Sequence, residues 1–201
     1  TVTASRIVYD KQAFSNVKLR ATQTDGRIDV PEFSLGFVGA TLNAHGAIAQ
    51  EGPASRMDAA VTLAHGNVDQ LRRIAGLAPV PVQGTLTIHV QASAHGVTTL
   101  NQATRRADVV AAVSMEKGEI AREIVEAASM DLRLLFRHAK GMTPVTCMLG
   151  VMQLHQGIGT VVPLRIRTGE GIIAAKVDFD LRRKWLDLVF ASRPFSTGFF
   201  A

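Results

Sequence analysis

Apolar and polar residues alternate along most of the chain, and turns that contain glycine separate the alternating runs. The run 17–21 precedes the turn pair Asp25-Gly26, and Phe33, Leu35 and Phe37 alternate in the next run. Alternation with a period of two is typical of strands that have one apolar face and one wetter face. The sequence therefore predicts a mainly β fold, with a curved antiparallel sheet that is either an open groove or partly closed.

The alternation is clearest in the C-terminal part of the chain. It predicts strands over 160–167, 172–181 and 185–191, joined by a glycine-rich turn at 168–171 and a charged turn at 182–184. Because the turns are short, we expect these strands to be antiparallel neighbours in the sheet.

Three of the predicted strands end in His-Gly, at His45, His65 and His95. Histidine tolerates a left-handed backbone better than most residues, so we interpret these pairs as turns rather than as a zinc site. The remaining histidines are interpreted as isolated surface residues: His89, His138 and His155.

Two stretches have helical periodicity instead. A short amphipathic helix is predicted over 67–76, where aliphatic residues recur at helical spacing and Asn67 can cap the N-terminus. A second helix of about three turns is predicted to begin at Gly118, because apolar residues from Ile120 onward share one face. Beyond Met130 the pattern fits either a strand or a continued helix, and we favour the helix.

We treat residues 1–201 as a single β-rich unit, which at this length buries about 70% of its unfolded surface. The stretch 94–108 is expected to be a mobile loop that loosely divides the chain into two halves. The sequence begins at Thr1 with neither a signal peptide nor an apolar run long enough to span a membrane. We therefore expect a segment of a longer protein.

Composition narrows the choice of ligands. The chain is 47% hydrophobic and 19% charged, and its net charge of +5 is spread along its length, which predicts a globular protein with weak attraction to anionic surfaces. With one Trp and one Tyr there is no aromatic platform for stacking bases. We therefore expect no nucleic-acid partner, and interpret the basic residues before Trp185 as a charged turn.

The sequence contains none of the common motifs for nucleophilic catalysis, metal binding or phosphate binding. Cys147 has no basic neighbour in sequence and is predicted to be a buried, inert thiol. Asp178 and Asp180 share a strand face with Lys176, where they are expected to be solvated unless another strand supplies a third carboxylate. We therefore expect no enzymatic activity, no metal and no cofactor.

The order of features from Val145 to Phe190 resembles the C-terminal region of AsmA-like proteins of the bacterial cell envelope. In that family a strand with a Cys leads through a Gly turn, a Thr-bearing strand, a Gly-rich turn and a strand with Asp to a final Leu-Asp-Leu strand. The matching positions here are Cys147, Gly157, Thr168, Gly169, Gly171, Asp178, Asp180 and 186–188. The segment from Gly118 to Ile124 also resembles the family's preceding segment.

The resemblance implies a periplasmic segment of a parent protein anchored in the inner membrane. Such a segment has no catalytic residues and takes part in phospholipid transport or outer-membrane assembly through an apolar β groove that holds acyl chains. The residues expected to face lipid are Leu164, Ile166, Ile173, Ala175, Val177 and Phe179.

Three alternatives stay open. The same apolar residues also fit an ordinary core packed against the two predicted helices. A module that binds an envelope partner by strand addition at a sheet edge fits the strand pattern as well. A hydrolase on a β scaffold would need Asp178 or Asp180 close to another carboxylate in a cleft.

Overall fold

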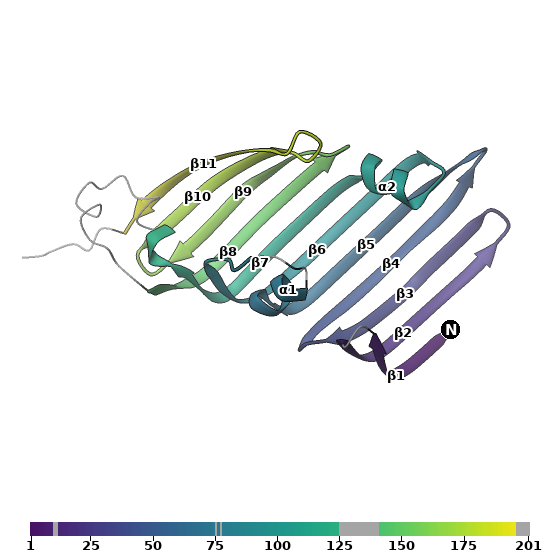
Figure 1. Cartoon of the computed structure of the whole chain (residues 1–201), viewed down its shortest axis with the longest axis horizontal. Helices are drawn as coiled ribbons and strands as arrows, with labels where there is room; N and C mark the ends of the chain where they lie inside the picture. Colours follow the sequence, from purple (N-terminus) through teal and green to yellow (C-terminus); the bar gives the residue numbers. More distant parts are fainter. Residues whose placement is uncertain (10–11, 75, 77, 125–140, 196–201) are drawn as a thin grey trace, which may run out of the picture.

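The computed structural model contains one antiparallel sheet of eleven strands, which follow one another in chain order (Figure 1). It describes residues 1–9, 12–74, 76, 78–124 and 141–195. The strands are β1 (Val2–Tyr9), β2 (Gln12–Thr24), β3 (Arg27–Phe37), β4 (Ala40–Glu51), β5 (Ala54–Asn67), β6 (Val82–Val97), β7 (Asp108–Ala121), β8 (Met142–His155), β9 (Ile158–Thr168), β10 (Gly171–Asp180) and β11 (Trp185–Pro194). β1 and β11 do not pair with each other, so the sheet is open. The predicted fold class is confirmed.

The first predicted helix is present as α1 (Val68–Ile74). Asn67 caps it as expected, because its Oδ1 atom accepts a hydrogen bond of 3.0 Å from the backbone N–H of Gln70. Gly76 follows with a φ of 66°, a left-handed conformation that glycine adopts without strain and that ends the helix.

The prediction of a loop over 94–108 is wrong, because most of this stretch belongs to a strand or a helix. Its first residues complete β6, and a second helix, α2 (Leu100–Arg106), occupies its centre. Thr99 caps α2 by accepting a hydrogen bond of 3.2 Å from the N–H of Gln102, whose side chain bonds back to Thr98. The spacing Thr-x-x-Gln is that of a capping box and is visible in the sequence, but here the glutamine side chain bonds to the residue before the N-cap.

The helix predicted from Gly118 does not begin there. Residues 118–121 belong to β7, and helical structure starts only at Arg122. Gly118 is needed in the strand because a Cβ atom at this position would lie 2.5 Å from the carbonyl oxygen of Gln83 on β6. The rest of this helix, and the ambiguous stretch beyond Met130, lie outside the described residues.

Turns between strands mostly fall where expected. Asp25-Gly26, 168–171 and the charged turn at 181–184 each join two adjacent strands. Thr168 organises the second of these, since its Oγ1 atom accepts hydrogen bonds from the N–H groups of Glu170 and Gly171.

None of the three His-Gly pairs forms the predicted turn. Those at His65 and His95 lie at register shifts of the β5–β6 ladder, which are bulges inside the strands. His65 has a φ of 57° and Gly96 a φ of 65°, each near the end of its strand. His45 instead lies inside β4, where it pairs with Ala60 of β5. Its flanking residues continue the ladder, so this His-Gly pair makes no turn.

Cys147 is exposed, so the predicted burial of its thiol is wrong. A bulge between Val145 and Cys147 adds a residue to β8 opposite β9. The extra residue shifts the alternation, so Thr146 and Cys147 are both exposed while Val145 is buried.

Candidate functional site

One face of the sheet is apolar across all of its strands. The ladder pairings place one residue of each strand in a single row across that face. The row consists of Val2, Leu19, Phe33, Ala44, Val61, Val90, Ala111, Met152, Val161, Val177 and Leu188. With strands spaced about 4.8 Å apart, it extends for about 50 Å. We call this surface the apolar face.

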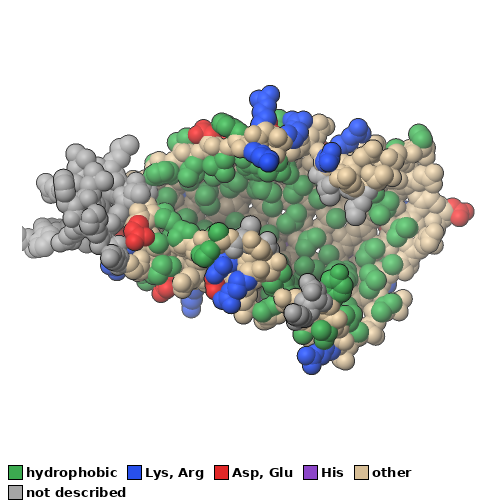
Figure 2. All heavy atoms as spheres, viewed as in Figure 1, with side chains coloured by type: hydrophobic (Ala, Val, Ile, Leu, Met, Phe, Trp, Pro, Cys, Tyr) green, Lys and Arg blue, Asp and Glu red, His purple; other side chains and the backbone are tan. Residues whose placement is uncertain are grey.

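The two helices lie at opposite ends of the strands, over the margins of the apolar face (Figure 1). Figure 2 shows this face as a hollow lined by hydrophobic side chains, with Lys and Arg side chains near its margins. At the α1 margin, Val68 packs with Met115, Ile120 and Ile173 in a buried cluster. At the α2 margin, Ala103 packs with Ala94 and Val97. The apolar face is therefore a trough with covered sides.

A distinct cavity of about 320 Å³ lies in this trough beside α2. Small and aliphatic side chains of β3 to β6 form its floor, among them Ile48, Met57 and Ala92, and Ala103 and Ala107 form the side next to the helix. Its lining has almost no polar side chains, which suits a hydrocarbon ligand.

All six residues expected to face lipid lie on the apolar face. Ile173 pairs with Ile166, and Ala175 pairs with Leu164, across the β9–β10 ladder. Ile173 is only 5% exposed and belongs to the buried cluster under α1, so at that margin the residues form an ordinary core. The other residues expected to face lipid are half-buried: Leu164, Ile166, Ala175, Val177 and Phe179.

Sequence reasoning missed the contribution of the N-terminal strands. β1 to β5 also contribute to the apolar face, with side chains that include the exposed residues Ile28 and Ile48. Their alternation was visible in the sequence, but nothing in it showed that every strand turns its apolar side to the same face.

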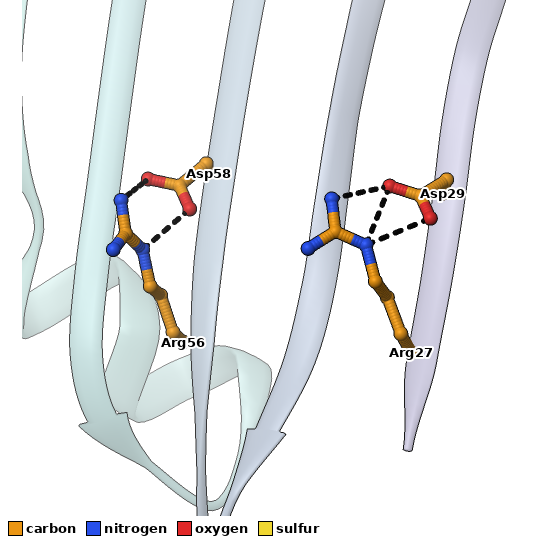
Figure 3. A network of polar contacts seen from close by, with 4 residues as sticks. All are labelled: Arg27, Asp29, Arg56 and Asp58. Carbon is orange, nitrogen blue, oxygen red and sulfur yellow. Dashed lines mark hydrogen bonds and ion pairs between the residues drawn. The ribbon is translucent and has the colours of Figure 1, made fainter. Parts of the chain in front are cut away.

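The opposite face, which we call the outer face, is polar and carries ion pairs within single strands. Arg27 and Asp29 on β3 lie 2.7 Å apart, and Arg56 and Asp58 on β5 repeat the same arrangement at 2.7 Å (Figure 3). Residues two apart on a strand share a face, so each arginine meets its own aspartate. The hydrogen bond from Arg27 lowers the pKa of Asp29, and that from Arg56 lowers the pKa of Asp58.

Asp178 and Asp180 line a hollow of about 1060 Å³ on the outer face, together with Asp108 and His155. Asp178 lies 2.7 Å from the Nζ atom of Lys176, and this contact lowers its pKa. Hydrogen bonds from the backbone N–H groups of Arg183 and Arg182 lower the pKa of Asp180.

Both shifts favour the ionised carboxylate, whereas a glycosidase general acid needs a raised pKa. Asp180 instead organises the turn into β11. Neither Asp178 nor Asp180 is therefore tuned to donate a proton to a substrate.

Most histidines lie apart from one another. His65 and His95 lie near the ends of antiparallel neighbours, at opposite margins of the sheet. His155, interpreted from sequence as isolated, in fact pairs with Asp108 of β7. His89 contacts Thr62 at 3.0 Å, and His138 lies outside the described residues. No three metal-ligating side chains gather within the described parts of the chain.

Within the same residues, no helix has both the length and the apolar character needed to cross a bilayer. Comparison with known proteins gives no family model, no curated protein and no solved structure that matches the chain.

Proposed function

We propose that this chain is a non-enzymatic lipid-binding segment, which holds phospholipid acyl chains in the trough of its apolar face. One observation carries the proposal: a row of apolar side chains crosses all eleven strands without a charged residue. Soluble proteins seldom leave an apolar surface of this extent uncovered unless it binds a partner or a lipid. The AsmA-like order of features in the C-terminal part adds a setting, the periplasmic side of a protein anchored in the inner membrane.

The chemistry of the trough fits acyl chains better than a ligand with specific polar groups. Its lining is aliphatic, and the polar groups of the strands are engaged in the sheet ladders. Each methylene group removed from water contributes about 0.8 kcal/mol wherever it lies along the trough. Affinity therefore depends on buried length rather than on one fixed position, as transport along a groove requires.

The test compares two triple variants that carry the same change on opposite faces. All six positions are exposed aliphatic residues, so neither variant opens a cavity. The apolar-face variant is I28D/I48D/L188D, and the outer-face variant is V110D/I158D/V189D. Each protein is purified without detergent, its co-purified phospholipid is quantified by mass spectrometry, and binding of a fluorescent phospholipid is titrated.

We expect the apolar-face variant to lose at least tenfold in affinity and most of its co-purified lipid, because a charge in the trough must be desolvated by the acyl chain. The outer-face variant should stay within about twofold of the natural sequence. Circular dichroism verifies that both variants keep their strand content. Equal losses in the two variants, or a natural protein that binds no phospholipid, would overturn the proposal.

A second candidate function is strand addition to an envelope protein. It is favoured by the open edges of the sheet, since β1 and β11 each lack a neighbour on one side within the described residues. β11 also exposes Leu186, Leu188 and Phe190. Such an edge is a ready template for another strand. A partner that binds in this way slows amide hydrogen exchange along β1 or β11, whereas a lipid in the trough leaves the exchange of these edge amides unchanged.

A further inference from the structure

The two helices over the apolar face share one design. Each has seven residues, connects β6 to a neighbouring strand, and carries a pair of arginines in its last turn, Arg72 and Arg73 in α1 and Arg105 and Arg106 in α2. Basic residues in the last turn stabilise a helix by interacting with its dipole. Both arginine pairs can stabilise their helices in this way, so the helix dipole does not explain a difference between the two margins of the trough.

The helices differ in whether a carboxylate pairs with their arginines. Asp69 in the first turn of α1 binds both of its arginines, at 2.7 Å from Arg72 and 2.5 Å from Arg73. α2 has no acidic residue, and no described carboxylate forms an ion pair with Arg105 or Arg106. The nearest carboxylate in sequence is Asp108, which is held by His155 on the outer face. The α2 margin therefore carries two positive charges that the α1 margin has neutralised.

The segment that carries these arginines borders the apolar cavity of about 320 Å³. Arg106 lies between Ala103 and Ala107, the residues of this segment that line the cavity. In a helix, positions three apart lie on the same side, so Arg106 lies at the same side of α2 as Ala103. Its one described hydrogen bond goes to the carbonyl oxygen of Gly96 at 3.2 Å, which leaves most of its five N–H donors available.

We propose that Arg106 binds the phosphate of a phospholipid headgroup while one of its acyl chains occupies the cavity beside α2, and that Arg105 adds positive charge to the same margin. This inference rests on the proposed lipid-binding function and adds the headgroup class and the orientation of the lipid. A guanidinium binds a phosphate through paired, charge-assisted hydrogen bonds, and the apolar floor begins directly beside it. A ligand that matches both the positive charge and the apolar cavity is an anionic amphiphile. We assign it as an anionic phospholipid.

The experiment compares two fluorescent lipids with identical acyl chains. Phosphatidic acid carries the phosphate, and diacylglycerol lacks it. Each is titrated into the detergent-free natural chain, into R105Q/R106Q, and into the matched control R72Q/R73Q, with circular dichroism to verify the fold. We expect the natural chain and the control to prefer phosphatidic acid by at least fivefold, and R105Q/R106Q to lose this preference while still binding diacylglycerol.

The outcomes separate the two proposals. If diacylglycerol binds and R105Q/R106Q keeps the full preference, or R72Q/R73Q loses as much, the headgroup site is overturned and the trough proposal stands. If neither lipid binds the natural chain, both fail. Inorganic phosphate is added as a competitor in the same titration, and we expect no displacement at millimolar concentration. Displacement would assign the arginines to free phosphate and overturn the lipid assignment.

Discussion

Gly84 of β6 and Gly118 of β7 lie directly opposite each other, so close that a Cβ atom on Gly84 would lie 2.8 Å from the Cα atom of Gly118. Met115 packs over this contact as one of the most buried side chains, at 1% exposure. The pair therefore lets the two backbones and the cluster under α1 approach at a distance that no larger residue allows.

Gly118→Ala should destabilise the protein by about 1–3 kcal/mol, because the added methyl group meets the carbonyl oxygen of Gln83, which cannot rotate away. The free energy of unfolding in urea measures the change. Gly169→Ala is the control, since a Cβ atom at Gly169 has no neighbour within 4 Å. Similar losses in the two variants would contradict the close contact.

Ile173→Ala should cost about 2–5 kcal/mol, because it leaves a cavity in the buried cluster beneath α1. Ile158→Ala removes the same atoms from a side chain that is 52% exposed, and should change stability by no more than about 0.5 kcal/mol. Thermal unfolding of the two variants checks the prediction. A small effect at Ile173 would mean that this margin of the apolar face is open rather than packed.

Asp180 should make the protein more stable at neutral than at acidic pH. Hydrogen bonds from the N–H groups of Arg183 and Arg182 lower its pKa in the folded state. A lowered pKa contributes stability above the unfolded pKa, and this contribution is lost as the pH falls through the folded pKa. Asp180→Asn keeps an acceptor oxygen but removes the charge.

The natural chain should therefore have the higher melting temperature at pH 7, and its advantage over Asp180→Asn should vanish at pH 2. Melting curves at intervals between these values measure the difference. An advantage that persists unchanged at pH 2 would show that the charge of Asp180 is not responsible.

Cys147 should react with a chromogenic aromatic disulfide in the native protein, because its side chain is exposed. The number of thiols titrated before unfolding should equal the number titrated in guanidinium chloride. Reaction only after unfolding would instead support the burial that simple alternation predicts.

Much of the fold was predictable because its strands are long and its turns are local. Alternation within each strand identified the β class, and Asn67 and Gly76 marked both ends of α1. Errors arose where one residue breaks the local pattern. The bulge beside Cys147 inverts the alternation of β8, and Gly118 serves a close backbone contact that is indistinguishable in sequence from a helix start.

Part of the apolar face of the candidate site could be predicted from the sequence, but the residues at its α2 margin could not. Leu164, Ala175 and Val177 were recognised as residues of one face, since they alternate within neighbouring strands. Arg105 and Arg106 lie in the stretch 94–108, which was expected from the sequence to be a loop and which contains α2. Their relation to the cavity depends on how α2 folds back over β6, a packing that no local pattern encodes.

The sequence by itself determined the strands, most of the turns, the first helix and the apolar side of each strand, because these depend on residues that are near neighbours along the chain. Only the tertiary structure decided that all eleven apolar sides share one face and that the sheet stays open. It also decided that Asp69 neutralises one margin of the trough while the other stays charged. These features depend on register and on the placement of the helices, which are set by packing between residues distant in sequence.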